Sequence, residues 1–388
     1  MSIDYPVAVW LPPEASRLLA AYRSGARARL AAFGRAVRRG LRVVGALTAA
    51  ALAGLGCLPT PDIHVPDFAP VPTADAGSGG DLQPDAARGD LGSVAGWTLD
   101  AQTGAKDTLR AAWAADQGLG EVYVVGHNGL ILHRSGGTWQ KEQAQSAGKP
   151  ITTNLYAVAA AAPDVVYAAG DAGVILRRTG GTWTQEGQEL MTTAALFGLA
   201  VLPTKEVVVV GDGGLIALRQ TSGVYVAEDT TALGAASLRA VGGATLDGLY
   251  AVGLGAVIAQ RAAGKWQLDP LPIDSADRGN YYAVAPGPDG VFVAGEYARV
   301  LRRDVAKWAP EATLAPMPPT VLHFFGLYAA PGELLAVGSS GTIQRRDSAT
   351  KTWTLDPSGV TAGLYGIAGA GTRTALTVGE QGTLLRRN

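Results

Sequence analysis

One pattern recurs seven times between Leu109 and Arg387, at a period of 40 to 46 residues. In each copy a glycine follows a Val/Ala-rich segment, and an arginine stands eight positions later. The glycines are Gly126, Gly170, Gly211, Gly253, Gly295, Gly338 and Gly379, and the arginines are Arg134, Arg178, Arg219, Arg261, Arg303, Arg346 and Arg387. A repeat of this length, built from short β-type segments, is typical of a β-propeller with one blade per repeat.

The second copy shows how one repeat is expected to fold. Segments 155–159, 165–170 and 174–178 are apolar or alternating, and a Thr-Gly-Gly turn then leads to a fourth segment at 182–184. The connection Gly170–Gly173 is short enough for a hairpin, and its glycines are expected where positive φ is needed. Each repeat therefore predicts four short antiparallel strands.

Two further registers recur in every copy. The third position of the first strand is always small: Ala111, Ala157, Gly198, Ala240, Ala283, Gly326 and Gly366. If this strand lies nearest the axis, neighbouring blades crowd there and exclude bulky side chains. The third strand carries an aliphatic residue at one register, which we expect in the core between blades: Ile131, Ile175, Ile216, Ile258, Val300, Ile343 and Leu384.

The aromatic residue of the fourth strand indicates how the ring closes. It occurs six times, at Trp139, Trp183, Tyr225, Trp266, Trp308 and Trp353. The chain ends before a seventh copy, but residues 96–100 around Trp97 closely match residues 351–356. We therefore predict an all-β, seven-bladed propeller of four-stranded antiparallel blades over 95–388. Its last blade takes its outer strand from near Trp97, which removes an exposed sheet edge.

Residues 1–56 are expected to be a signal region. Closely spaced arginines precede an apolar run over 43–55, which small residues follow. These are the features of a secretory signal, and the run is shorter than the roughly 20 residues of a transmembrane helix. Because 1–36 are too long and too arginine-rich for a normal basic region, we expect that translation begins near Val37. The alternative is a long basic region that is removed with the signal.

Cys57 is the single cysteine, so no disulfide can form within the chain. The small residues before it resemble a bacterial lipobox, although Gly54 stands where a leucine is usual. This resemblance implies that Cys57 carries a lipid and that the exported protein is anchored in the bacterial cell envelope, at the outer membrane or cell surface. An ordinary cleaved signal with an incidental cysteine is the alternative.

Residues 57–94 are rich in Pro, Ala, Gly and Asp and are expected to be a disordered tether. Residues 1–56 hold eight arginines and two acids, which leaves 24 basic and 31 acidic residues after them, a net charge of −7. A chain with this balance is not expected to bind nucleic acid through its net charge. We expect the propeller to be a monomeric ring.

The turns after Arg134 and Arg178, with the sequences Ser-Gly-Gly-Thr-Trp and Thr-Gly-Gly-Thr-Trp, resemble degenerate Asp-box (BNR) repeats. The longer pattern over 166–183 is similar to the propellers of photosystem II stability and assembly factors. The resemblance covers 95–388 and implies a propeller with an assembly or binding role. No turn keeps the Asp-box aspartate, and the catalytic residues of sialidases cannot be assigned.

The seven repeat arginines allow two interpretations. They could form a basic ring that binds carboxylates or sulfated glycans, since guanidinium binds such groups bidentately. Alternatively, each could stack on the nearby Trp or bond turn carbonyls. Their perfect periodicity favours the structural role, because a ligand rarely needs seven copies.

The loops between second and third strands are expected around the channel mouth. Their first residues are His127, Asp171, Asp212, Leu254, Glu296, Ser339 and Glu380. Carboxylates that converge there could hold Ca²⁺, with His127 beside them, although Asp and Ser also bond their own backbone in tight turns. We favour the turn role and assign no metal site.

The longer loops between blades share this face, and variable loops on a rigid scaffold are where binding usually occurs. They lead into Tyr282 and Phe325, which match Tyr156 and Phe197 and are expected to pack in the core. No histidine or acid spacing identifies a catalytic residue. We therefore expect a non-enzymatic lipoprotein whose propeller binds an envelope protein or a polysaccharide. The alternative is a carbohydrate-active hydrolase or lyase with carboxylates at the channel mouth.

Overall fold

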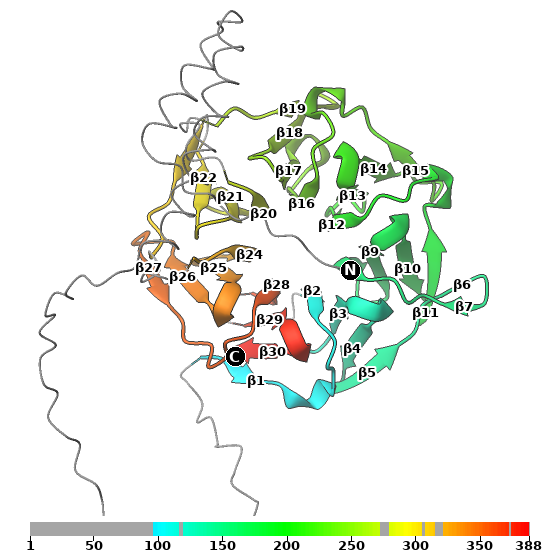
Figure 1. Ribbon diagram of the computed structural model, residues 1–388, viewed down its shortest axis with the longest axis horizontal. Helices are drawn as coiled ribbons and strands as arrows, with labels where there is room; N and C mark the ends of the chain where they lie inside the picture. Colours follow the sequence, from blue (N-terminus) through cyan, green and yellow to red (C-terminus); the bar gives the residue numbers. More distant parts are fainter. Residues whose placement is uncertain are drawn as a thin grey trace, which may run out of the picture. The chain divides into compact units, whose positions relative to one another are not determined.

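The computed structural model describes residues 96–115, 119–271, 279–304, 307–314, 321–371 and 374–387. Seven four-stranded antiparallel sheets stand as blades around a central axis (Figure 1). The predicted seven-bladed propeller is confirmed. The signal region, the expected start near Val37, Cys57 and the tether lie outside the described residues.

Each blade runs from an inner to an outer strand. The first three blades are β2 (Leu109–Ala114), β3 (Val122–Gly126), β4 (Ile131–Ser135) and β5 (Thr138–Glu142); β8 (Leu155–Ala162), β9 (Val165–Gly170), β10 (Ile175–Thr179) and β11 (Thr182–Glu186); and β12 (Leu196–Val201), β13 (Val207–Gly211), β14 (Ile216–Arg219) and β15 (Tyr225–Ala227). The fourth and fifth are β16 (Leu238–Gly242), β17 (Tyr250–Gly253), β18 (Ile258–Ala262) and β19 (Lys265–Leu268); and β20 (Tyr281–Gly287), β21 (Gly290–Gly295), β22 (Val300–Arg303) and β23 (Trp308–Pro310).

The sixth blade is β24 (Phe324–Ala330), β25 (Glu333–Gly338), β26 (Ile343–Asp347) and β27 (Trp353–Leu355). The seventh is β28 (Leu364–Gly369), β29 (Ala375–Gly379) and β30 (Leu384–Arg387), with β1 (Thr98–Leu99) outermost. A small hairpin, β6 (Gln145–Ser146) and β7 (Lys149–Pro150), stands between the first two blades. Short 3-10 turns occupy η2 (Ala101–Thr103), η3 (His127–Gly129), η4 (Asp171–Gly173), η5 (Gln188–Leu190), η6 (Asp212–Gly214), η7 (Thr231–Leu233), η8 (Leu246–Gly248), η10 (Ser339–Gly341) and η11 (Glu380–Gly382).

The ring closes between the two ends of the propeller, as the repeat of Trp97 predicts. β1 pairs with β30, with Thr98 opposite Arg386, and the two strands lie side by side in Figure 1. The amide of Asp100 continues the ladder by donating to the carbonyl of Leu384 at 2.9 Å. The Trp97 side chain is 3% exposed and packs in the core between the last two blades. Closure thus satisfies the edge that β30 would otherwise expose.

The core lies between the blades. The aliphatic residues of the third strands are at most 1% exposed, which confirms their predicted place. The cluster around Ile131, for example, joins Tyr123 of the first blade to Leu155 and Trp183 of the second. The small residues of the first strands mark the tightest contacts: a Cβ atom on Gly198 would lie 2.9 Å from the Cα of Ala240 in the next blade.

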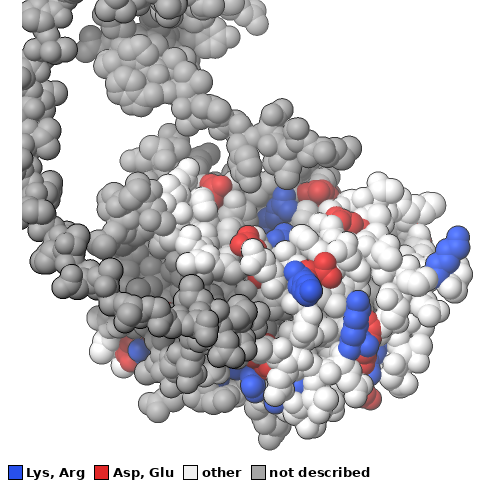
Figure 2. Space-filling model, turned by 60° about the horizontal axis from the view of Figure 1, so that its bottom comes forward, with Lys and Arg blue, Asp and Glu red and all other residues white. Residues whose placement is uncertain are grey.

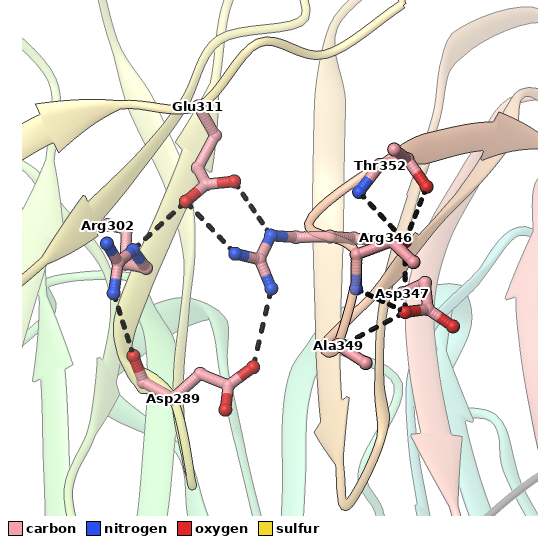
Figure 3. Close-up of polar contacts among 8 residues, drawn as sticks. Asp289, Arg302, Glu311, Arg346, Asp347, Ala349 and Thr352 are labelled. Atoms are coloured by element: carbon pink, nitrogen blue, oxygen red, sulfur yellow. Dashed lines mark hydrogen bonds and ion pairs between the residues drawn. The ribbon is translucent and has the colours of Figure 1, made fainter.

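The repeat arginines form ion pairs between neighbouring blades. Six of them form ion pairs, at 2.7 to 3.6 Å, with a carboxylate three residues after the fourth-strand aromatic of the preceding blade. The pairs are Arg178–Glu142, Arg219–Glu186, Arg261–Glu228, Arg303–Asp269, Arg346–Glu311 and Arg387–Asp356. In Figure 3 Arg346, which is 1% exposed, reaches across to Glu311 and Asp289 of the fifth blade.

The partner of these arginines differs from the partners expected from the sequence. Their main contact is a carboxylate of the preceding blade, and most stack on an aromatic ring of that blade, as Arg178 does on Tyr123 at 5.4 Å. Arg134 is the exception, since it donates to the carbonyl of Leu119. A guanidinium buried between blades requires a carboxylate partner because an unpaired buried charge is costly.

The glycine that marks each repeat is required because a side chain would not fit there. Gly170 has an extended backbone with φ of −166°, so the expectation of a positive φ there is wrong. A Cβ atom on Gly170 would lie 2.0 Å from the carbonyl oxygen of Asn154, and the chain could not approach so closely. Gly173, at the other end of the connection, does have a positive φ, of 69°. In the part of the chain that the structure describes, none of the helical segments has the length and hydropathy of a membrane span.

Candidate functional site

A β-bulge near the start of every first strand creates a ring of side chains at the channel mouth. In all seven blades the pairing with the second strand skips the second residue of the first strand, as between Leu109 and Ala111. A bulge leaves one residue outside the ladder and re-aims its side chain. The seven re-aimed residues, which we call the mouth ring, are Arg110, Tyr156, Phe197, Arg239, Tyr282, Phe325 and Tyr365.

The members of the mouth ring contact one another around the channel. Six of the seven neighbouring pairs are in aromatic or cation–π contact, at 3.8 to 5.5 Å. Arg239 lies 3.8 Å from the centre of the Phe197 ring, and Arg110 lies between Tyr156 and Tyr365. All seven side chains are half-buried, so the ring is ordered by its own contacts and still faces open space.

The mouth ring encloses a cavity of about 400 Å³, which Leu254 and Asn280 also line. Deeper in the channel, a second space of about 220 Å³ is lined by the same ring and by the next two residues of each first strand. Those deeper residues are all small or aliphatic: the small third-position residues, followed by Ala112, Val158, Leu199, Val241, Val284, Leu327 and Ile367. The site therefore combines an aromatic and basic mouth with aliphatic side chains beneath it.

Three of the carboxylates predicted to face the mouth accept hydrogen bonds from the tyrosines of the mouth ring. Asp171 accepts from the Tyr156 hydroxyl at 3.1 Å. Glu296 accepts from Tyr282 at 3.1 Å, and Glu380 accepts from Tyr365 at 2.7 Å. Each pair joins a second-to-third-strand loop to the first strand of the same blade. The loops therefore fix the orientation of the phenol rings, a role that the sequence did not reveal.

The other predicted loop residues have local roles. Asp212 accepts a hydrogen bond from Ser237, and the Ser339 hydroxyl accepts from the backbone of His323 at 2.9 Å. The pKa of His127 is lowered by burial and by the charge of Arg110. Among the described residues, no three His, Cys, Asp or Glu side chains are grouped closely enough to hold a metal ion. Each predicted carboxylate lies with partners of its own rather than with the others.

In two of the hydroxyl–carboxylate pairs, Tyr282–Glu296 and Tyr365–Glu380, the local interactions favour a neutral phenol and a charged acid. Burial, together with the Glu296 and Glu380 charges, raises the pKa values of Tyr282 and Tyr365 to about 12. The bond from Tyr365 lowers the pKa of Glu380. Burial alone would raise the pKa of Glu296, but hydrogen bonds from Asn280 and Tyr282 lower it. Near neutral pH these tyrosines are donors and these carboxylates are ionised acceptors.

Arg110 and Arg239 are the residues whose role the sequence analysis missed. Neither has a carboxylate within 4 Å in the part of the chain that the structure describes, whereas six repeat arginines do. The Nε atom of Arg239 is buried without a hydrogen-bond partner. Burial lowers the pKa of Arg239; the charge of Asp212 opposes this shift, and the charge of Arg110 adds to it. The available signal was the second position of the first strand, where arginine replaces an aromatic residue in two of seven copies.

Tyr282 and Phe325 were expected in the core, and that expectation is wrong. They belong to the mouth ring with Tyr156 and Phe197, because the bulge turns their register toward the channel. On the face that Figure 2 shows, basic and acidic side chains are interspersed rather than gathered by sign.

The fold is shared with solved propellers of low sequence identity. YCF48 bound to D1 peptide is 18% identical and has a TM-score of 0.59, over 75% of this chain and 96% of that one. YCF48 from Cyanidioschyzon merolae is 18% identical with a TM-score of 0.60, over 76% and 99% of the two chains. Virginiamycin B lyase from Staphylococcus aureus is 14% identical with a TM-score of 0.63, over 75% and 98%.

At these identities the similarities show the fold alone, that of a β-propeller. No protein-family model matches the chain, and no curated protein matches it. The similar structures include a peptide-bound propeller and a lyase, so the function must be argued from the site itself.

Proposed function

We propose that this protein is a non-enzymatic, lipid-anchored envelope protein that binds a protein partner at the mouth of its propeller channel. The observation that carries the proposal is the mouth ring, in which seven bulged residues place aromatic and basic side chains around one open cavity. Pockets that combine aromatic walls with a few convergent polar groups are typical binding sites. The complex of YCF48 with a D1 peptide is consistent with peptide binding by a propeller of this fold.

The chemistry of the mouth favours binding over glycoside hydrolysis. Hydrolysis needs a carboxylic acid whose raised pKa keeps it protonated near neutral pH, opposite a second carboxylate. The pKa values of Glu296 and Glu380 are instead lowered, and both accept hydrogen bonds from tyrosines. These carboxylates are placed to orient phenol rings, which is the arrangement of a rigid recognition surface.

The anchor is part of the proposal and rests on the lipobox-like sequence before Cys57. Acyl chains bind to a bilayer by about 0.8 kcal/mol per buried methylene, so two or more chains give durable anchoring. Mass spectrometry of the native N-terminal peptide tests this, with Cys57→Ser as control. A mature protein that begins at a residue other than Cys57, or whose cysteine carries no lipid, would refute the anchor.

Partner binding is tested by crosslinking in native envelopes. We expect that a Tyr282→Ala/Phe325→Ala variant loses the partner that the wild type captures. Leu355→Ala, which removes an exposed apolar side chain on the outer strand β27, is the matched control and should retain that partner. Equal capture by both variants would place the binding surface away from the mouth and overturn the proposal.

A further inference from the structure

Two cationic side chains share the mouth cavity, and among the described residues neither forms an ion pair with a carboxylate within 4 Å. The charges of Asp212 and Glu380 act on Arg239 and Arg110 only from farther away. Arg110 and Arg239 line the same space, and the carboxylates nearest to it are engaged by tyrosine or serine hydroxyls. Their like charges disfavour each other, and one Arg239 nitrogen is buried without a partner. A buried donor without an acceptor, close to a second cation, costs free energy that an anionic ligand would recover.

We infer that the mouth cavity is a binding site for a carboxylate attached to an apolar or aromatic group, with Arg110 and Arg239 as its anion-recognising residues. The inference rests on the proposed function and names the chemistry that the partner presents. A polypeptide chain end with an apolar final side chain supplies this chemistry, and so does a small free acid of the same kind. Guanidinium groups bind carboxylates through paired, charge-assisted hydrogen bonds.

The rest of the cavity accounts for the apolar part of the ligand. Five of the seven mouth-ring residues are aromatic, and the side chains beneath them are small or aliphatic. The three tyrosine hydroxyls donate hydrogen bonds to carboxylates of their own blades. The rings therefore present mainly their apolar faces and edges to the cavity. A uronate chain, which carries hydroxyls on every side, would bury several of them against these aliphatic side chains without partners. An apolar group would bury only apolar surface there.

The site is tested by calorimetry on the full chain with N-acetyl-phenylalanine as the probe. N-acetyl-phenylalaninamide has no charge and is expected to bind at least about tenfold more weakly, because it loses the charge-assisted bonds. N-acetylglycine keeps the carboxylate but lacks the ring, and it too should bind more weakly. Equal binding of the acid and its amide would overturn the inference, as would tighter binding of a galacturonate oligomer than of N-acetyl-phenylalanine.

Variants assign the recognition to the two arginines. Arg110→Gln and Arg239→Gln should each weaken binding of the acid by about tenfold and abolish the preference over the amide. Arg345→Gln makes the same chemical change to an arginine that pairs with Asp356 instead, so binding should be unchanged. Thermal unfolding verifies that each variant is folded. Wild-type affinity in folded Arg110→Gln and Arg239→Gln would overturn the assignment.

A further comparison separates the two sources of the ligand. A hexapeptide that ends in phenylalanine, with a free or amidated terminus, should bind at least as well as the single residue if the ligand is a chain end. Binding of the single residue but not of the peptide would support the site with a small acid as its ligand. If mouth-dependent partner capture persists without any preference for the acid, the inference fails and the proposed function stands. If capture does not depend on the mouth, the proposed function fails whatever the probes show.

Discussion

Arg178 in the second blade holds both oxygens of Glu142 at the end of the first. Its Nε and Nη2 atoms each donate to the carboxylate at 2.8 Å. Trp183, directly across the hairpin from Arg178, donates to the same carboxylate at 2.6 Å. The arginine–acid pair recurs around the ring, so the repeated arginine and the repeated acid together form one ion pair at each of six interfaces between blades.

Removing one of these ion pairs between blades should destabilise the propeller. Arg178→Ala leaves Glu142, which is 16% exposed, without its main partner, and we expect a loss of about 3 kcal/mol in the free energy of unfolding. Arg177→Ala is the control, since Arg177 is 32% exposed and pairs at 3.6 Å; its cost should stay below about 1 kcal/mol. Urea unfolding followed by tryptophan fluorescence measures both. Equal losses in the two variants would contradict the structural role of Arg178.

Acidic pH should destabilise the interface between the first two blades. Burial alone would raise the pKa of Glu142, but hydrogen bonds from Arg178 and Trp183 lower it below its ordinary value of 4.5. A carboxylate with a lowered pKa supplies stability that is fully present above that ordinary value and is lost as the pH falls through the folded-state pKa. Melting temperatures between pH 7 and pH 3 should therefore fall less steeply in Glu142→Gln than in the wild type. If the melting temperature falls equally with pH in both proteins, ionisation of Glu142 does not contribute to stability.

Ring closure depends on Trp97. Trp97→Ala removes a side chain that is 3% exposed, and we expect a cost of about 3 to 5 kcal/mol. Leu99→Ala changes the same short strand at a side chain that is 53% exposed, so the cost should be within about 0.5 kcal/mol. Differential scanning calorimetry compares the two variants. A propeller that melts normally after loss of Trp97 would show that closure does not need its side chain.

The repeat glycine should tolerate no side chain. Gly170→Ala places a Cβ atom 2.0 Å from the Asn154 carbonyl oxygen, and the backbone shift that relieves this contact should cost about 1 to 3 kcal/mol. Gly120→Ala is the control, because an added Cβ there meets no atom within 4 Å. Chemical unfolding of both variants checks the expectation. A neutral Gly170→Ala would mean that the close approach is relieved without cost.

The pairing of Tyr365 with Glu380 can be followed by tyrosine absorbance. Burial, the hydrogen bond to Glu380 and the charge of Glu380 raise the pKa of Tyr365 to about 12. In Glu380→Gln the charge is absent, so one tyrosine should ionise closer to its ordinary value near 10. Difference titration at 295 nm between wild type and variant should therefore show one additional phenolate between pH 10 and pH 12. Identical titrations would show that Glu380 does not act on Tyr365.

Much of the architecture could be predicted from the repeat alone. The seven glycines, the small residues of the first strands and the match of Trp97 to the fourth-strand aromatics each follow from local requirements of space and pairing. The repeat arginines were visible too. Their partners were harder to recognise, because each acid stands in the preceding repeat and only the packing of adjacent blades brings the two together.

The blade strands, the number of blades and the way the ring closes could be predicted from the repeat, because they depend on patterns within one copy or between two copies of it. The set of side chains that face the channel became visible only once the blades were arranged in three dimensions. A bulge shifts the alternation of each first strand by one residue, and so it moves Tyr282 and Phe325 from an expected core register to the mouth. It also places Arg110 and Arg239, which lie 129 positions apart, in one cavity because seven first strands converge on a common axis.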